Sequence, residues 1–297
     1  MTTTISIAGR EVGNDLPVYV IAEGGVNHNG SVDLAVQLTH AAAEAGACAV
    51  KWQVRKPELH ADPSKPLRYS CAFPPDVLVT ELQHRGAMEF TAEGYARVSS
   101  EAEAVGLDCF ASAWDEPSVE FLAAFHPPAW KVASATVTDL PTLDAIRWAA
   151  RRDGSAIIMS TGMSTIEQID RAVDTLGREQ LALMHCVSTY PCRVEDCNLR
   201  VIPYLLDRYG VPVGWSGHET AAVSVTLRAL RWGASFVERH LTLDRSMRGS
   251  DHAASLEPQG FALMVREIRA GESADGDGVK RVTEGEALQA ARLRRRT

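Results

Sequence analysis

The sequence predicts an α/β fold, a (β/α)8 TIM barrel with a short N-terminal hairpin. Short apolar runs alternate with amphipathic helical runs, and eight such pairs follow one another. Apolar strands joined by helices form parallel sheets through right-handed crossovers, and eight units in about 250 residues is the size of this barrel. A doubly wound open sheet is the alternative, but it would normally carry a phosphate-binding glycine fingerprint, whose spacing Gly24, Gly25 and Gly30 do not have.

Strands and helices are expected in strict alternation. The first strand, VYVIAEGG, is apolar and bounded by glycine, and the first helix has a Ser31 N-cap and a closing Gly46. The stretch 55–90 is less regular and contains several prolines, and each later pair repeats an apolar run and a run of helical periodicity. The strands are expected at 18–25, 48–54, 107–113, 129–134, 155–161, 181–188, 212–218 and 235–243. The helices are expected at 31–46, 91–106, 115–125, 140–151, 164–177, 198–210, 220–233 and 258–274.

Three parts of the chain are expected from this pattern. Residues 1–16 form a hairpin that plugs the barrel, residues 17–275 form the barrel, and residues 276–297 form a linker-like tail. A net charge of -8 argues against a nucleic-acid partner, because such binding needs a basic face. No run of eighteen apolar residues and no basic leader occurs, so we expect no membrane partner and a cytoplasmic protein.

The six cysteines are expected to be free, mostly buried thiols. They lack paired CxxC spacing, and several lie in apolar strand-like runs. A metal site at Cys186, Cys192 and Cys197 is disfavoured because the spacing fits no usual zinc pattern.

Polar residues interrupt the apolar strands near their C-terminal ends, where barrel enzymes carry their catalytic groups. Every expected strand contributes at least one of them, so we expect a polar cluster at one end of the barrel. The members are Glu23, Lys51, Gln53, Ser112, Lys131, Ser134, Ser160, Thr161, His185, Ser188, Ser216, His218, Glu238 and His240.

Two lysines, Lys51 and Lys131, lie in strands that a closed barrel buries, so each needs an anionic partner. One interpretation is a salt bridge across the barrel mouth with Glu23 or Glu238. The other is a pair of cations for a phosphate and a carboxylate, helped by neighbouring serine and threonine hydroxyls. In an acidic protein, cations confined to the barrel mouth suit an anionic small molecule.

His218 and His240 end strands that are neighbours in a barrel, with Glu23 across the mouth. A lone strand histidine is usually a core residue, but the pair suggests a divalent metal with open positions. Two imidazoles and few carboxylates fit manganese, iron, cobalt or zinc better than magnesium or calcium.

Two loops offer further candidate contacts. His28, just past the first strand, is expected near the substrate, although it could be a turn former in an Asn-rich loop. Tyr190, Arg248, Asp251 and His252 are candidate contacts for a polyhydroxylated co-substrate. The alternative for the last three is a solvated charge cluster.

Seven ordered motifs then resemble the sialic acid synthase (N-acetylneuraminate synthase) family, over about residues 17 to 275. They are IAEGGVNHNGS, AVKWQ, WKVAS, MSTGMS, MHCVSTYP, VGWSGH and VERHLTLDRSMRGSDHAASLEP. The resemblance implies a transferase of carbohydrate biosynthesis. Such an enzyme condenses phosphoenolpyruvate with N-acetylmannosamine or a related sugar aldehyde, breaks a C–O bond to release phosphate, and yields a 2-keto-3-deoxy sugar acid.

The resemblance also implies a role for each matching residue. The phosphoenolpyruvate cradle would be Lys51, Lys131, Ser134 and Ser188, with Ser216 adjacent. Ser112 and Ser160 of the polar cluster are further candidate substrate contacts, which the strand positions suggest independently of the resemblance. The metal ligands would be His218 and His240, with manganese as the usual metal and zinc, cobalt or magnesium as alternatives. The acid/base residue would be Glu23, with Glu238 in the same catalytic group. Sugar contacts would be Gln53, Tyr190, Asp251 and His252.

Two departures from the family pattern stand out. The motif at the seventh strand usually reads Ser-Asp-His, and here it is Ser216-Gly217-His218 followed by Glu219. Family members usually continue from a linker resembling GVKRVTEGEALQAARLRRR into a small antifreeze-like domain that closes over the sugar, whereas this sequence ends in the linker. Either the sequence is cut there or the enzyme never had the domain, and in the second case we expect a more open sugar pocket. The sequence leaves open whether the chain forms a homodimer.

Two other functions stay open at this stage. One is a class II type aldolase or lyase that uses pyruvate. The other is a catalytically silent barrel that serves as a partner subunit, although the retained Glu23, Lys51, Lys131, His218 and His240 argue against it.

Overall fold

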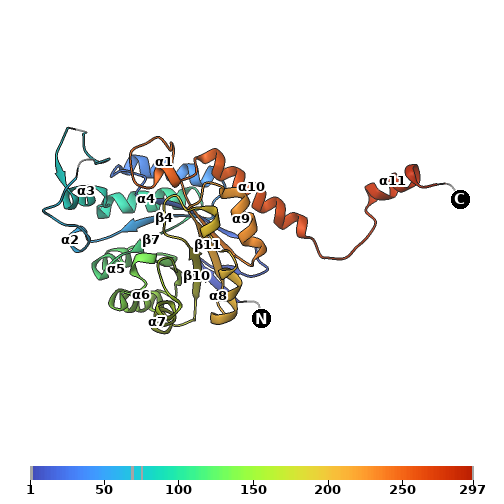
Figure 1. Cartoon of the computed structure of the whole chain (residues 1–297), viewed down its shortest axis with the longest axis horizontal. Coiled ribbons are helices and arrows are strands. Elements are labelled where there is room, and N and C mark those ends of the chain that lie inside the picture. Colours follow the sequence, from blue (N-terminus) through green and yellow to red (C-terminus); the bar gives the residue numbers. More distant parts are fainter. Residues whose placement is uncertain (1–2, 68–69, 75, 296–297) are drawn as a thin grey trace.

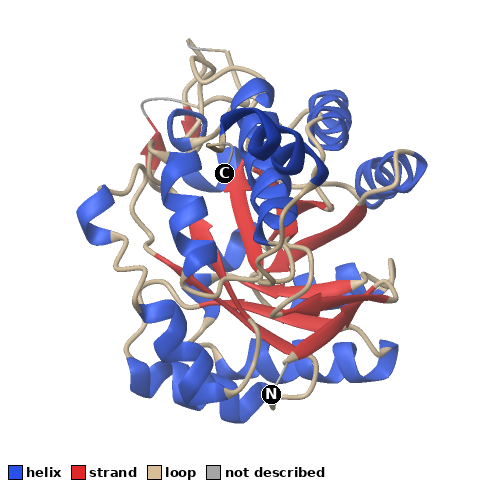
Figure 2. Cartoon of the chain, turned by 90° about the vertical axis from the view of Figure 1, so that its right-hand side faces the viewer, coloured by secondary structure: helices blue, strands red, loops and turns tan. Residues whose placement is uncertain are grey.

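Eight parallel strands close into a barrel in a computed structural model, which describes residues 3–67, 70–74 and 76–295 (Figures 1 and 2). The strands neighbour one another in the order β10-β11-β12-β3-β4-β7-β8-β9, and the predicted barrel is confirmed. Their bounds are β3 Tyr19–Gly25, β4 Ala49–Val54, β7 Asp108–Ala113, β8 Ala129–Val132, β9 Ala156–Ser160, β10 Leu181–Cys186, β11 Val213–Gly217 and β12 Phe236–His240.

A helix follows each strand and covers the outside of the barrel (Figure 1). Local sequence sets the ends of these helices: the Ser31 side chain caps the first one by accepting from the Leu34 amide, and Gly154, in a left-handed conformation, ends another. The helices are α1 Val32–Glu44, α4 Ala92–Ala104, α5 Glu116–Ala123, α6 Leu140–Asp153, α7 Ile166–Leu176, α8 Val201–Tyr209, α9 Ala222–Arg231 and α10 Pro258–Asp275.

Alternation along the strands divides the barrel interior into an apolar half and a polar half. Tyr19 and Ile21 on β3, like Phe236 on β12, belong to an apolar cluster that fills the N-terminal half of the barrel. Ile5 and Val12 belong to the same cluster and come from the antiparallel hairpin β1 Thr4–Ile7 and β2 Arg10–Gly13. The hairpin therefore closes this end, and the polar half faces the other end.

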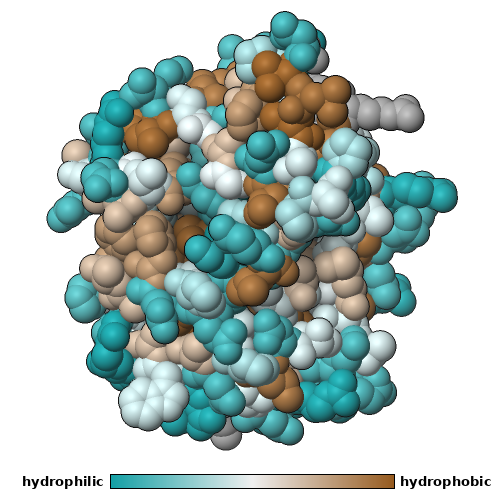
Figure 3. All heavy atoms as spheres, turned by 90° about the vertical axis from the view of Figure 1, so that its left-hand side faces the viewer, coloured by the Kyte–Doolittle hydropathy of each residue, from teal (hydrophilic) through white to brown (hydrophobic). Residues whose placement is uncertain are grey.

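Two segments form structure that the sequence pattern did not specify. The irregular stretch after β4 contains α2 Pro57–His60, β5 Pro66–Leu67, β6 Val79–Thr80 and α3 Glu81–Met88. The face that carries α2 and α3 mixes hydrophobic and hydrophilic side chains (Figure 3). In the tail, α11 Glu284–Leu293 begins at a capping box formed by Thr283 and Glu286, and it stands away from the barrel (Figure 1). Within the described residues, no helix is both long and apolar enough to cross a membrane.

Candidate active site

The polar half of the barrel interior surrounds a cavity of about 200 Å³. Successive inward positions of each strand supply its walls, so β4 contributes Lys51 and Gln53 while Trp52 packs outside against the helices. The structure brings together most residues predicted from the sequence. They are Glu23, Lys51, Gln53, Ser112, Lys131, Ser134, Ser160, Ser188, Tyr190, Ser216, His218, Glu238 and His240.

Lys51 is held by carboxylates. Its Nζ lies 2.6 Å from Glu23 Oε2 and 3.7 Å from Glu238 Oε1, and it donates to Ser112 Oγ at 3.2 Å. Burial would lower the pKa of Lys51, but the two carboxylates outweigh burial and raise it. The salt-bridge interpretation therefore holds for this lysine, whose charge also balances Glu23.

The buried charge of Lys131 is balanced less closely by carboxylates than that of Lys51. Its Nζ donates to Ser160 Oγ at 2.5 Å and to the Val132 carbonyl at 3.1 Å, and the nearest carboxylate oxygen of Glu238 is 4.0 Å away. Burial lowers the pKa of Lys131, Glu238 raises it, and Lys51 lowers it again, so the pKa stays below its usual value. An anion in the cavity would supply the close partner that Lys131 needs.

Glu238 lies between the two ammonium groups and accepts a hydrogen bond from Ser216 Oγ at 3.2 Å. Burial alone would raise its pKa, but Lys51 and Lys131 hold the pKa well below its ordinary value, so this carboxylate stays ionised. The formal charges of the two lysines and the two glutamates sum to zero.

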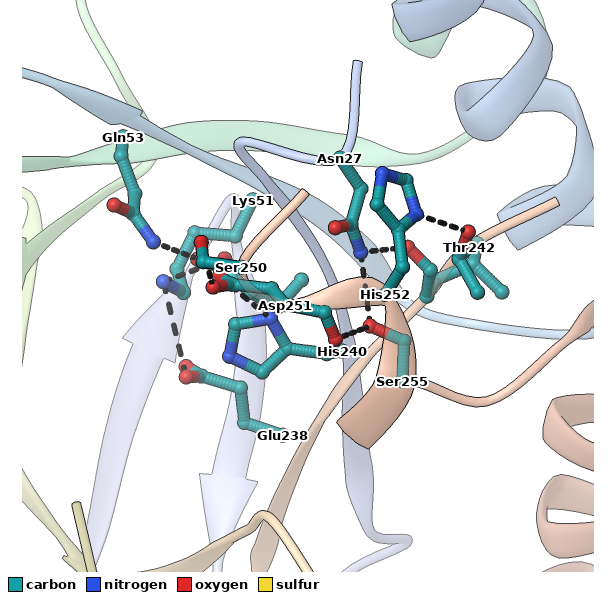
Figure 4. A network of polar contacts seen from close by, with 12 residues as sticks. Asn27, Lys51, Gln53, Glu238, His240, Thr242, Ser250, Asp251, His252 and Ser255 are labelled. Atoms are coloured by element: carbon teal, nitrogen blue, oxygen red, sulfur yellow. Dashed lines mark hydrogen bonds and ion pairs between the residues drawn. The ribbon is translucent and has the colours of Figure 1, made fainter. Parts of the chain in front are cut away.

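The His218 and His240 rings lie with their centroids 5.4 Å apart at the cavity wall. His218 donates from Nδ1 to the Val187 carbonyl at 2.7 Å, which leaves the lone pair on Nε2. Burial and the nearby His240 lower the pKa of His218 to about 3, so the ring is neutral as a metal ligand requires. The buried His240 Nδ1 has no hydrogen-bond partner and lies 3.5 Å from Asp251 Oδ2 (Figure 4).

These two imidazoles are the residues that could hold a divalent metal at this wall of the cavity. Among the residues that the structure describes, no group of three histidine, cysteine or carboxylate side chains is arranged to hold an ion. A site of this kind would leave several coordination positions for reacting groups.

Gln53 links the inner cavity to a second cavity nearer the surface. It donates from Nε2 to Glu23 Oε1 at 3.0 Å, and its Oε1 accepts from Arg55 Nη2 at 3.0 Å. Arg55 in turn lies over the Trp114 ring, with its guanidinium carbon 4.8 Å from the ring centroid. Sequence reasoning missed Arg55 and Trp114, although Arg55 continues the inward alternation of Lys51 and Gln53.

The outer cavity measures about 600 Å³ and shares Gln53, Trp114 and Tyr190 with the inner one. Gly249, Ser250 and Asp251 of the loop after β12 form one wall, and residues of the 55–90 segment form another. The predicted contact Asp251 is thus placed at a cavity.

Three predicted substrate contacts do not line either cavity. His28 is buried, stacks on Phe90 at 4.4 Å between ring centroids, and accepts from the Gly30 amide. His252 is buried and hydrogen-bonded to Thr242 Oγ1 at 2.7 Å (Figure 4). Arg248 is exposed on the same loop. The two histidines instead stabilise the loops that follow β3 and β12.

Two further polar residues of the predicted cluster lie apart from the cavity. His185 is on the outer side of β10 with Nε2 2.8 Å from the Cys197 carbonyl, and Thr161 donates to the Met184 carbonyl. The six cysteines are free, as expected, but Cys48, Cys71 and Cys109 are only partly buried.

The absence of a side chain at Gly217 leaves room for a buried ion pair on the outer side of β11 and β12. Arg239 Nη1 lies 2.5 Å from Glu219 Oε1, and both side chains are almost fully buried. A Cβ atom on Gly217 would overlap the Arg239 guanidinium and lie 2.8 Å from Glu219 Oε2. Glu219 thus supplies a carboxylate next to the position where the usual motif has aspartate.

Substituting Gly217→Ala is expected to lower the free energy of unfolding by about 2 to 4 kcal/mol, because the methyl group would break this buried pair. Urea denaturation measures the effect. Gly271→Ala, in helix α10 with no atom near the added methyl, is the control and should be neutral or slightly stabilising. Equal stability of the two variants would contradict this account of Gly217.

Comparison with known proteins places the chain in a family. The model of the NeuB family matches residues 38–280. An N,N'-diacetyllegionaminic acid synthase from Legionella pneumophila is 33% identical over 291 residues, which cover 95% of this chain and 80% of that protein. The human N-acetylneuraminate-9-phosphate synthase is 35% identical over 92% of this chain and 76% of its own length.

A solved structure agrees with these relatives. The N-acetylneuraminic acid synthetase from Leptospira borgpetersenii superposes with a TM-score of 0.82 at 27% identity and covers 99% of both chains. The resemblance seen in the motifs is thereby confirmed, and the chain is an enzyme that belongs to the NeuB family.

Proposed function

We propose that the enzyme condenses phosphoenolpyruvate with a sugar aldehyde to give a 2-keto-3-deoxy sugar acid and phosphate. The observation that carries this proposal is the pair of joined cavities. A small inner one holds Lys131 without a close carboxylate, and a larger outer one meets it at Gln53, Trp114 and Tyr190. A small anion and a bulkier acceptor would therefore meet at Glu23 and the two imidazoles.

Phosphoenolpyruvate would occupy the inner cavity. Lys131, with the hydroxyls of Ser134, Ser160 and Ser188 around it, offers a cation and several hydrogen-bond donors to a phosphate or carboxylate. Lys131 and Ser160 are buried, and all four groups line the cavity already, so they would stabilise charge on the leaving phosphate without reorganisation.

Charge balance supports a divalent metal, most simply manganese, held by His218 and His240. The inner cavity has no net charge among its lysines and glutamates, and a phosphate ester and a carboxylate together bring about three negative charges. A metal bound there would polarise the acceptor aldehyde and make its carbon electrophilic.

Glu23 is the residue best placed to move a proton. C3 of phosphoenolpyruvate forms the new bond to the aldehyde carbon, water adds at C2, and the C2–O bond to phosphate breaks. Water loses one proton as it adds at C2, and the aldehyde oxygen gains one, so one carboxylate can accept and return this proton. When the C2–O bond to phosphate breaks, the C2 hydroxyl becomes the ketone and its proton goes to the departing phosphate. Lys51 and Gln53 hold Glu23 in position through contacts of 2.6 and 3.0 Å.

The test is phosphate release from phosphoenolpyruvate with manganese and a panel containing N-acetylmannosamine, mannose and arabinose 5-phosphate. Phosphoenolpyruvate labelled with heavy oxygen in its bridging position should yield labelled phosphate, because the C–O bond breaks. Background release with every aldehyde would overturn the proposal, and aldol formation from free pyruvate would favour the aldolase alternative. Absence of phosphoenolpyruvate binding in a calorimetric titration would favour a silent barrel.

A further inference from the structure

The buried ion pair between Arg239 and Glu219 lies directly behind both imidazoles of the active site. Arg239 precedes His240 in β12, and Glu219 follows His218, the first residue after β11. Because side chains alternate along a strand, the inward position of His240 leaves Arg239 on the outer side of the barrel. The pair therefore lies on the outer side of the wall whose inner side carries the imidazoles.

The Arg239 guanidinium joins two segments of the chain at two points. Its Nη1 lies 2.5 Å from Glu219 Oε1, and its Nη2 donates to the Glu219 backbone carbonyl at 2.6 Å. Arg239 belongs to β12 and Glu219 lies past the end of β11, so these contacts tie the segment after β11 to β12. Because a planar guanidinium donates in fixed directions, it constrains both the distance and the orientation of its acceptors.

His218 lies beyond the ladder that joins the two strands. In the described part of the chain, the last residues paired between β11 and β12 are Gly217 and Arg239. The His218 carbonyl accepts from the Cys192 amide at 3.1 Å, and its Nδ1 donates to the Val187 carbonyl at 2.7 Å. Both contacts connect His218 to the loop after β10, so the ion pair supplies a connection on the other side, toward β12.

Stability alone is a weak explanation for this ion pair. Each of the two side chains is at most 1% exposed, so both charges lose their hydration on folding, and apolar residues of similar volume often stabilise such a site equally well. Glu219 Oε2 and Trp215 Nε1 are buried without a hydrogen-bond partner among the described residues, so the cost of burial is only partly offset. What the pair adds beyond an apolar contact is a fixed geometry.

We propose that Glu219 and Arg239 are positioning residues, which set the separation of His218 and His240 so that one divalent metal ion can contact both imidazoles. This inference rests on the proposed function, in which these two histidines hold manganese. Their ring centroids are 5.4 Å apart and their ring planes meet at 61°. The pair stabilises this arrangement from the outer side of the barrel, without contact to the metal or the substrates.

Calorimetric titration with manganese alone tests this role, because it measures the metal site without turnover. Arg239→Lys keeps the charge but lacks the fork that reaches two Glu219 oxygens, so manganese affinity is expected to fall by about tenfold. The double variant Glu219→Leu/Arg239→Met removes the pair without leaving an unpaired buried charge. Its melting temperature should stay close to that of the unaltered chain, while its manganese affinity should fall at least as far.

Tyr19→Phe is the control for loss of a buried polar contact. Tyr19 belongs to the apolar half of the barrel and its hydroxyl donates to Asp108 Oδ2 at 2.6 Å, so this variant should lose stability without losing manganese affinity. Unchanged affinity in the double variant would overturn the inference and leave the proposed function standing, since the pair would then be structural. No manganese binding by the unaltered chain would overturn both the proposed metal site and this inference.

Discussion

Replacing Lys131 with methionine is expected to lower kcat/KM for phosphoenolpyruvate by about 10³-fold while leaving the free energy of unfolding unchanged or slightly raised. The activity falls because the variant loses the buried cation that faces the anion. The stability persists because Lys131 has no carboxylate closer than 4.0 Å, and methionine fills a similar volume without a desolvation cost. Steady-state kinetics and urea denaturation measure the two quantities.

Lys51→Met is the matched control, since it removes the other buried lysine of the same cavity. Its Nζ lies 2.6 Å from Glu23, so its loss leaves a buried carboxylate without a counter-ion and should cost about 3 to 5 kcal/mol of stability as well as activity. Comparable destabilisation by the two substitutions would show that Lys131 is a structural cation and not one reserved for substrate.

The barrel and its polar end could be predicted because both follow from local pattern. A closed parallel barrel needs apolar strands and amphipathic helices, and inward positions recur at every second residue. Lys51 and Gln53 therefore had to share a cavity with Glu23 once the barrel was assumed. The same rule puts His185 outside, because Cys186 next to it points inward.

The loops could not be predicted in this way, because their partners are distant in sequence and no period relates them. Asn27 donates to the Leu241 carbonyl and to Ser255 Oγ, across more than 200 residues, and so joins the loops after β3 and β12 (Figure 4). His28 and His252 pack within these same loops. Sequence reasoning predicted substrate contacts for them, because polar loop residues at a barrel mouth often bind substrate. The ion pair between Arg55 and Glu89 likewise could not be predicted, because it depends on how the irregular 55–90 segment packs.

Removing the His218 imidazole with His218→Ala is expected to weaken manganese binding by at least about 100-fold. Even residues that only orient a metal ligand contribute 10- to 100-fold to affinity, and His218 would be one of two ligands supplied by the protein. Its hydrogen bond to the Val187 carbonyl fixes the tautomer, so that Nε2 presents a lone pair, and its low pKa keeps this nitrogen free of a proton. Calorimetric titration with manganese measures the affinity directly and does not depend on turnover.

His126→Ala is the control for this titration, because the His126 side chain is 74% exposed and lies on the loop between α5 and β8, at the end of the barrel opposite the cavity. It should bind manganese like the unaltered chain, and it should show the same rise in melting temperature when the metal is added. The His218→Ala variant should show little rise. Unchanged affinity in His218→Ala would exclude this imidazole from the metal site, and its hydrogen bond to the Val187 carbonyl would then be a structural contact between the loops after β11 and β10.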